Sequence, residues 1–391
     1  MNRSVFITGG TGFVGKAMLT RLVRDKTYSK IFVLTRESAA KSADQRISGL
    51  IDEIFGMSLA AEARRKIVPV AGDLTKARLG IADEGRRQLA LEVTQILHVG
   101  ASTEFGAPLR EAREQNLWGT SHVLDFAMEC SATGLDRFDY VSTAYVAGTK
   151  PGVVDEGTLD RGQSFANTYE QSKYEAEGLV RSYANRLPIA VYRPSIIVGD
   201  SRHGYTPHFK VLYLPLRILG KEYLPFVAIN ADGYLDVVPV DYVADGLHAL
   251  MSTGESLGGT HYLTAGLGGE VKIKEFLKDA YEFMGYEQKP MLPFWVFQVI
   301  KNTPISKLYD DRFWDTAAMA EPYFCYLRGP KVRFDNRKTV ALLARFGVSA
   351  PSWNDYKQEI FSFCRASRFG KSVPMPAYQY YLPQSEQLKE A

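Results

Sequence analysis

Near its amino terminus the chain places a glycine-rich turn directly between a predicted strand and a predicted helix. Residues 5–8 read as a strand, and a helical pattern covers residues 13–25. Glycine recurs at every third position here: Gly9 and Gly12 lie between the two elements, and Gly15 lies in the first turn of the predicted helix. In such a unit the first glycine permits a tight turn, the second lets the backbone approach a pyrophosphate, and the third lets the helix pack closely on the sheet. Because the helix N-terminus would then offer free N–H groups to the phosphates, the turn predicts a dinucleotide site.

The first half of the chain repeats this order of strand and helix. Further short apolar runs predict strands at residues 31–34, 67–70, 95–98, 138–141 and 189–192. Their nearly continuous apolar character indicates burial on both faces, which is typical of parallel sheets. The sequence therefore predicts an α/β fold with a doubly wound parallel sheet of the Rossmann type, followed by a smaller, mostly helical C-terminal part.

Composition and charge exclude several other classes of protein. The chain of 391 residues has 47 Lys and Arg against 44 Asp and Glu, a net charge of +3, so a nucleic-acid-binding protein is not expected. Its three cysteines lie far apart and its six histidines have no HxxxH or HExxH spacing, so no metal site is predicted. The sequence shows no signal-peptide pattern and no run of 18 apolar residues, so we expect a cytoplasmic protein.

The end of the second predicted strand indicates which dinucleotide is bound. Arg36 stands where NAD-binding proteins usually carry an acidic residue for the ribose hydroxyls. An arginine there can pair with the 2′-phosphate of NADP, so we predict NADP(H) as the cofactor. The alternative is a solvated surface arginine, and the neighbouring Glu37 could point either toward the ribose or away from it. After the third strand, Asp73 and Leu74 are predicted to hold the adenine, with capping of a turn as the alternative for Asp73.

A tyrosine and a lysine four residues apart are the candidate catalytic pair. Tyr169 and Lys173 form YxxxK in a helical pattern, which puts both side chains on one helix face. A nearby ammonium favours tyrosinate, so we predict that Lys173 lowers the pKa of Tyr169 and lets it exchange a proton near neutral pH. The alternative is a solvated helix face. Thr143 follows the fifth strand, at the sheet edge where ligands bind, and its hydroxyl can donate a hydrogen bond to a substrate carbonyl.

Together these motifs resemble the extended short-chain dehydrogenase/reductases. Within that family the chain is most similar to the fatty acyl-CoA reductases and to the thioester reductase domains of carboxylic acid reductases and peptide synthetases. The resemblance runs from the N-terminus to about Arg368. Besides the turn TGGTGFVG and the YxxxK motif, it is carried by HVGAST (98–103), NLWGT (116–120), YVSTAYVAG (140–148), RPSIIVG (193–199) and DVVPVDYVA (236–244). In the first of these, Gly100 and Ser102 depart from the family's HxAA pattern.

The resemblance implies a role for each motif. Thr143 would be the catalytic hydroxyl, with Ser142 a structural hydroxyl at the strand end. Tyr169 would supply the proton, and Lys173 would hold the ribose and tune Tyr169. The predicted cofactor-binding residues are Gly9, Thr11, Gly12, Phe13, Val14, Gly15, Arg36, Asp73, Leu74, Ala101, Ser102, Asn116, Tyr169, Lys173, Pro194, Ser195 and Ile196.

The predicted domains follow the motifs. We expect residues 1–265 to form the NADP-binding Rossmann domain, with 194–233 contributing to the substrate side, and residues 266–391 to form a mainly helical region that covers the substrate. The segment 207–229 is rich in aromatic and aliphatic residues, and the run 294–297 is aromatic as well. The first could be the wall of an acyl pocket, a peripheral membrane contact, or both, and the second is a further candidate for the wall. The family implies a cover over the acyl chain, and ordinary helical core is the alternative.

The resemblance implies an NADPH-dependent reductase of acyl thioesters, with a fatty acyl-CoA or an acyl carrier protein as substrate and an aldehyde or alcohol as product. The alternative is another activity of the extended family, such as a nucleotide-sugar epimerase or a ketone or alcohol dehydrogenase, and a non-enzymatic NADP sensor is a third class. Ala144 and Tyr145 stand where sugar dehydratases carry acidic residues, and the intact Thr143, Tyr169 and Lys173 argue against a sensor. The carrier, the acyl length, the pathway and the oligomeric state are left open by the sequence.

Overall fold

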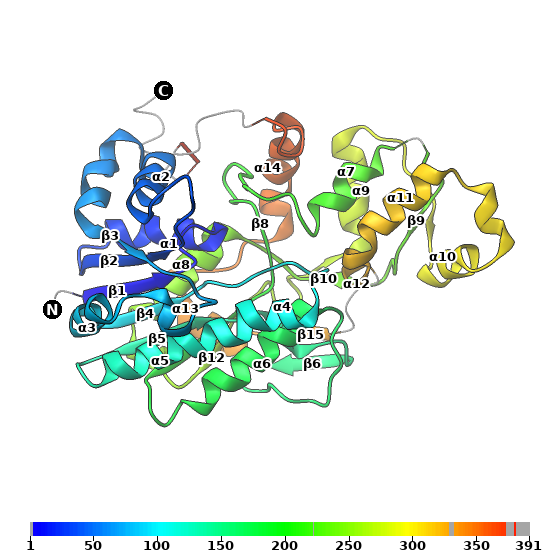
Figure 1. Cartoon of the computed structure of the whole chain (residues 1–391). Coiled ribbons are helices and arrows are strands. Elements are labelled where there is room, and N and C mark those ends of the chain that lie inside the picture. Colours follow the sequence, from blue (N-terminus) through cyan, green and yellow to red (C-terminus); the bar gives the residue numbers. More distant parts are fainter. Residues whose placement is uncertain (1–2, 222, 328–331, 373–378, 381–391) are drawn as a thin grey trace.

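The computed structural model describes residues 3–221, 223–327, 332–372 and 379–380, and its centre is a seven-stranded parallel sheet (Figure 1). The strand order is β12-β7-β5-β4-β1-β2-β3. These strands are β1 (Arg3–Thr8), β2 (Tyr28–Thr35), β3 (Ile67–Ala71), β4 (Gln95–His98), β5 (Arg137–Val141), β7 (Ile189–Pro194) and β12 (Thr260–Leu263). All six strands predicted from the first half of the chain lie in this sheet, so the predicted doubly wound α/β fold is confirmed.

Both faces of the sheet are buried under helices. In β1, Val5 and Ile7 belong to one hydrophobic core and Phe6 to the other, as the alternation of side chains along a strand requires. One face packs on α1 (Phe13–Arg24), α2 (Ala43–Lys66) and α8 (Val240–Met251), and the other on α3 (Asp83–Glu92), α5 (Gly119–Ser131) and α6 (Thr168–Ser182). This burial explains why the strands are apolar at nearly every position.

The strand order reverses between β1 and β4, because β2 and β3 lie on one side of β1 and the remaining strands lie on the other. Open α/β sheets bind ligands above the carboxyl ends of the strands at such a switch point. Thr8 and His98, the last residues of the two strands, are paired in register, and Thr8 Oγ1 lies 2.6 Å from His98 Nδ1. The glycine turn after β1 therefore meets the loop after β4 at this edge.

The second part of the chain adds a smaller, mostly helical lobe, at the right in Figure 1. Residues 237–239 pair with residues 196–198 beside the main sheet, and residues 332–335 pair with residues 152–155 of the first half of the chain. The short pairs are β8 (Ile196–Val198) with β11 (Val237–Pro239), β10 (Tyr234–Leu235) with β13 (Val271–Lys272), β9 (Val227–Ala228) with β14 (Met291–Leu292), and β6 (Gly152–Asp155) with β15 (Val332–Asp335). The other helices are α4 (Leu109–Arg113), α7 (Tyr213–Leu219), α9 (Ile273–Met284), α10 (Phe294–Lys301), α11 (Asp311–Ala320), α12 (Phe324–Leu327), α13 (Arg337–Ala344) and α14 (Trp353–Ala366).

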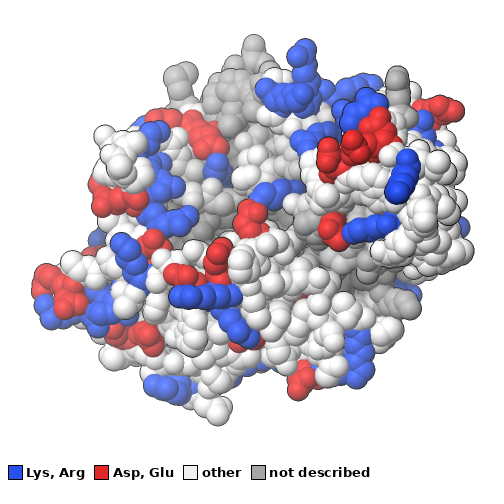
Figure 2. Space-filling model, turned by 45° about the vertical axis from the view of Figure 1, so that its right-hand side comes forward, with Lys and Arg blue, Asp and Glu red and all other residues white. Residues whose placement is uncertain are grey.

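The apolar residues proposed as an acyl wall mostly form core. Phe226 from the segment 207–229 packs with Phe297 of α10 and Phe313 of α11 in a cluster that lies within the lobe. Phe209 packs instead on Phe363, with ring centroids 6.0 Å apart. Across the described ranges, no helix combines the length and apolarity needed to cross a bilayer. On the face shown in Figure 2, Lys and Arg are interspersed with Asp and Glu rather than gathered in one patch.

Candidate active site

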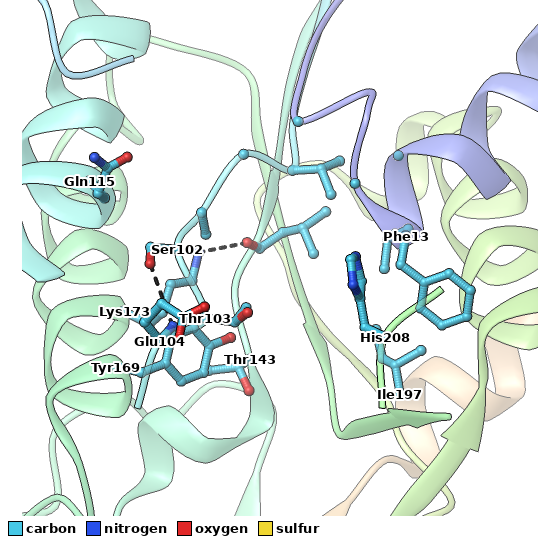
Figure 3. A pocket seen from close by; sticks show the side chains of 18 of the residues that line it. Phe13, Ser102, Thr103, Glu104, Gln115, Thr143, Tyr169, Lys173, Ile197 and His208 are labelled. Carbon is cyan, nitrogen blue, oxygen red and sulfur yellow. Dashed lines mark hydrogen bonds between the residues drawn. The ribbon is translucent and has the colours of Figure 1, made fainter. Parts of the chain in front are cut away.

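A pocket of about 860 Å³ lies along the carboxyl edge of the sheet, at the switch point. The glycine turn, the loops after β3 and β4, the ends of β2, β5 and β7, helix α6 and the segment 206–213 all contribute side chains or backbone to its lining. Figure 3 shows Phe13 of the glycine turn on one side of this space, with Thr143, Tyr169 and Lys173 on the other. The fold thus brings the predicted cofactor turn and the predicted catalytic residues into one cavity.

The glycine turn fits a dinucleotide because it leaves no room for side chains. Gly9 has a φ of +72°, and a Cβ there would lie 2.6 Å from the backbone nitrogen of Gly100. A Cβ on Gly15 would lie 2.1 Å from the carbonyl oxygen of Gly9. Helix α1 begins after Gly12 with no side-chain cap and no acidic residue in its first turn, and residues 13–15 line the pocket. The first-turn N–H groups therefore face the space where a pyrophosphate would bind.

Two arginines border the pocket near the end of β2. Arg36 follows this strand and Arg46 lies in α2, and the Arg46 guanidinium donates a hydrogen bond to the Arg36 carbonyl. Glu37, which left the orientation open in the sequence, accepts a hydrogen bond at 3.3 Å from the backbone N–H of Ala43 at the start of α2. Sequence reasoning missed Arg46, because a charged residue in a predicted helix gives no sign of which element its side chain approaches.

Every predicted site residue except Asn116 lines the pocket. The Asn116 side chain accepts a hydrogen bond from the Ser102 N–H at 2.7 Å and donates to the Ser102 carbonyl and to Ser172 Oγ, at 3.1 and 2.9 Å. It therefore ties the loop after β4 to α6 instead of bordering the cavity. Asp73 lines the pocket, and its carboxylate also caps the following turn, where it accepts hydrogen bonds from the N–H and the hydroxyl of Thr75, each at 2.9 Å.

The two hydroxyls that follow β5 have different surroundings. Ser142 Oγ donates to Glu177 Oε2 at 2.6 Å, in a fully buried contact. Thr143 Oγ1 has longer contacts, 3.3 Å from the Tyr145 N–H and 3.4 Å from the carbonyl of the last residue of β7. Figure 3 shows the Thr143 and Tyr169 side chains next to each other, close enough for the Thr143 hydroxyl to lower the pKa of the Tyr169 phenol. Of the two hydroxyls, that of Thr143 is therefore the one placed to meet a ligand together with Tyr169.

Lys173 is held by strand β5. Its ammonium donates to Tyr140 Oη and to the Val141 carbonyl, each at 2.8 Å, and Tyr140 was not predicted as part of the site. Burial lowers the pKa of Lys173 to about 7, against the opposing charge of Glu177. Burial also raises the pKa of Tyr169 to about 12, and the hydrogen bond with Thr143 only partly offsets this. The predicted lowering of the pKa of Tyr169 is therefore wrong, because desolvation exceeds the effect of nearby polar groups.

A buried ion cluster lies next to the candidate catalytic residues, at the junction of α6, β5 and β7. The Arg193 guanidinium donates to Glu177 at 3.0 and 2.6 Å, and Arg181 donates to the same carboxylate at 2.9 Å. Burial opposes the ionisation of Glu177, but the charge and hydrogen bonds of Arg193, with those of Arg181, outweigh it and hold the pKa below its usual value. The carboxylate thus links α6 to β7 and, through Ser142, to the end of β5, the elements that carry the candidate catalytic side chains.

Aromatic side chains close the pocket beyond Tyr169. Phe105 lies with its ring centroid 5.4 Å from that of Tyr169 and 5.7 Å from that of Tyr326, and the Tyr326 and Tyr145 centroids are 5.3 Å apart. All of them line the pocket, and we call Phe105, Tyr145 and Tyr326 the aromatic wall. The Tyr326 hydroxyl donates at 3.3 Å to Glu170, whose pKa burial raises to about 7. The wall joins a loop, a turn and α12, so no local sequence pattern could reveal it.

Comparison with known proteins identifies the family. The sequence profile of the family described as male sterility protein matches residues 7–247, more than half of the chain. The chain belongs to this family. It is 29% identical over 342 residues to the nonribosomal peptide synthetase asaC of Aspergillus flavus, covering 78% of this chain and 33% of that protein. It is also 29% identical over 279 residues to the fatty acyl-CoA reductase wat of Drosophila melanogaster, covering 63% and 54%. The chain thus spans between a third and about half of the length of these relatives.

Solved structures agree with this assignment to the male sterility protein family. The terminal R domain from the myxalamid PKS-NRPS biosynthetic pathway has a TM-score of 0.79 and 28% identity, covering 95% of this chain and 92% of that one. The UDP-glucuronic acid 4-epimerase from Bacillus cereus in complex with NAD has a TM-score of 0.63 over 94% and 98%, and at 17% identity this likeness shows the fold alone. The predicted membership of the extended short-chain dehydrogenase/reductases, close to the fatty acyl-CoA and thioester reductases, is confirmed.

Proposed function

We propose that this protein reduces an acyl thioester to an aldehyde with NADPH. The observation that carries the proposal is the meeting of the Thr143 hydroxyl and the Tyr169 phenol in one cavity with the glycine turn. Two hydroxyl groups beside a nicotinamide site suit the reduction of a carbonyl group. The relatedness to a fatty acyl-CoA reductase and to a terminal R domain supports a thioester as the compound that carries this carbonyl.

The roles of the residues follow from their positions. The glycine turn and Lys173 would hold a nicotinamide cofactor, which would supply a hydride for the carbonyl carbon of the thioester. The carbonyl oxygen accepts hydrogen bonds from Thr143 and Tyr169, which stabilise the negative charge that develops on it. Tyr169 is protonated at neutral pH, since its pKa is about 12, and it gives its proton to this oxygen. The hemithioacetal then loses the carrier thiol and leaves the aldehyde, while Lys173 holds the ribose from its position on α6 beside the end of β5.

The pair of arginines supports NADPH over NADH. Arg36 and Arg46 border the same end of the pocket, and both guanidinium groups can approach a 2′-phosphate there. Arginine suits this task because its planar donors match phosphate oxygens and it stays charged at all working pH values. Glu37 does not oppose this arrangement, because its carboxylate is engaged with the start of α2.

The test is NADPH oxidation, with identification of the product, on octanoyl-CoA, an octanoyl carrier protein, octanal and UDP-glucuronic acid. We expect aldehyde from at least one thioester, and Tyr169→Phe should reduce turnover by roughly 10²–10⁴ while NADPH binding is retained. Tyr174→Phe on the same helix is the matched control, because its ring packs on Phe165 away from the pocket lining. Full activity of Tyr169→Phe would refute the mechanism. Conversion of the nucleotide sugar without any thioester reduction would favour the epimerase alternative.

A further inference from the structure

A buried hydroxyl without a partner lies in the lining of the pocket, on a residue close to Thr143. Tyr145 is 6% exposed and lines the cavity, and its hydroxyl has no hydrogen-bond partner among the described residues. A hydroxyl taken out of water without a partner destabilises a folded protein. Tyr242 has a similar unpartnered hydroxyl, but it belongs to α8, where it is part of the hydrophobic core, and it does not line the pocket. Only for Tyr145, of these two, can a ligand supply the missing partner.

The ring that carries this hydroxyl is held in place. It packs edge-on against Tyr326 and Phe334, with centroid distances of 5.3 and 5.6 Å and interplanar angles of 90° and 84°. The backbone N–H of Tyr145 donates to Thr143 Oγ1 at 3.3 Å, so the backbone of Tyr145 lies beside the proposed catalytic hydroxyl. Because the ring is clamped from two sides, the hydroxyl cannot turn to a distant partner without disturbing the aromatic wall.

The surroundings also determine the chemistry of this hydroxyl. Burial, together with the charges of Asp236 and Glu170, raises the pKa of Tyr145 well above its ordinary value of 10. The group is therefore a protonated phenol that can donate one hydrogen bond at neutral pH. A ligand that satisfies it must bring an acceptor oxygen into a region otherwise walled by aromatic rings.

We propose that the Tyr145 hydroxyl donates a hydrogen bond to an oxygen on the acyl chain near the thioester, so that the site selects acyl groups with a hydroxyl or oxo substituent there. An unsubstituted alkyl chain would bury the hydroxyl unpaired and bind less well in the transition state. Val211, Leu212 and Tyr213 line the cavity, but the side chains of Phe209, Phe226 and Phe297 are not part of its lining and do not extend it as an alkyl channel. The inference rests on the proposed thioester reductase activity.

The experiment compares two thioesters of equal chain length. Values of kcat/KM for 3-hydroxyoctanoyl and octanoyl N-acetylcysteamine thioesters are measured with NADPH for the unmutated protein, Tyr145→Phe and Tyr242→Phe. We expect the unmutated protein to favour the hydroxylated substrate by about tenfold, the size of one hydrogen bond between uncharged groups. Tyr145→Phe should bring the ratio close to one by slowing the hydroxylated substrate. Tyr242→Phe should keep the original ratio, because it removes a comparable hydroxyl outside the pocket.

Melting temperatures complete the test. Tyr145→Phe keeps the ring contacts and removes a group without a partner, so its melting temperature should be equal to or above that of the unmutated protein. An unchanged substrate ratio in Tyr145→Phe, or a clear fall in its melting temperature, would overturn the role of Tyr145. If the folded, NADPH-binding protein reduces neither thioester, the proposed function itself fails. The ratio of the two kcat/KM values tests only the role of Tyr145, so the two failures can be told apart.

Discussion

Replacing Ser142 and Thr143 one at a time should separate stability from catalysis at adjacent positions. Ser142→Ala removes the hydroxyl that donates to Glu177 at 2.6 Å, in a contact where Ser142 is 4% exposed and Glu177 is not exposed at all. A hydrogen bond to a charged group contributes about 1.5–3 kcal/mol, so the free energy of unfolding should fall by about 2 kcal/mol. Catalysis should change little, because Thr143 keeps its position.

Thr143→Val should have the opposite effect. The valine keeps the shape of the side chain, and the lost hydrogen bonds to backbone groups are long, at 3.3 and 3.4 Å. We therefore expect less than about 1 kcal/mol of destabilisation. Turnover should fall by roughly 10²–10³, because a donor to the developing oxyanion is gone.

Both variants are measured in the same two assays, urea unfolding followed by fluorescence and kcat/KM with a thioester and NADPH. The unfolding slope should stay the same, so that a shift of the midpoint reports stability alone. A Ser142→Ala protein that is inactive but as stable as the unmutated chain would reverse the assignment of the two hydroxyls. Normal turnover in Thr143→Val would refute the role of Thr143 altogether.

Three further predictions concern the cofactor site and a buried carboxyl group. Arg36→Ala and Arg46→Ala should each weaken NADPH binding by about tenfold or more with little effect on NADH, measured by fluorescence titration, and an equal loss for both cofactors would contradict a 2′-phosphate contact. Gly15→Ala should abolish dinucleotide binding, because its Cβ would lie 2.1 Å from a carbonyl oxygen of the turn, whereas Gly49→Ala, with no atom within 4 Å of the added Cβ, should bind normally in the same titration. Glu170 has a pKa raised to about 7 by burial, so its favourable contribution is present below its unfolded value near 4.5 and is lost as the pH rises through 7. Glu170→Gln, which is always neutral, should therefore melt like the unmutated protein at pH 4.5 and at a higher temperature at pH 8, and a gap that does not depend on pH would refute the assignment.

Local patterns predicted much of this molecule. The apolar runs that became β1 to β5 and β7 each form a strand of the main sheet, and the glycine spacing places the turn where β1 meets α1. The i, i+4 spacing puts Tyr169 and Lys173 on α6, and both line the pocket. In the apolar segment 207–229, Leu212 and Tyr213 line the pocket whereas Phe226 lies in a separate core, and the sequence could not separate the two because an apolar side chain looks alike in either place.

What the sequence determines by itself is whatever a few neighbouring residues decide: strand or helix, the glycine cradle, and which side chains share a helix face. Only the tertiary structure decided that Arg46 lies beside Arg36 at the pocket. The same holds for the contact of Ser142 with Glu177 and the position of Thr143 next to Tyr169. It also holds for the packing of the aromatic wall against Tyr169. The same holds for the pKa values of Tyr169 and Lys173, which depend on burial. The physical reason is that desolvation and contact depend on distances between residues far apart along the chain, and those distances exist only after the sheet, its helices and the lobe have packed together.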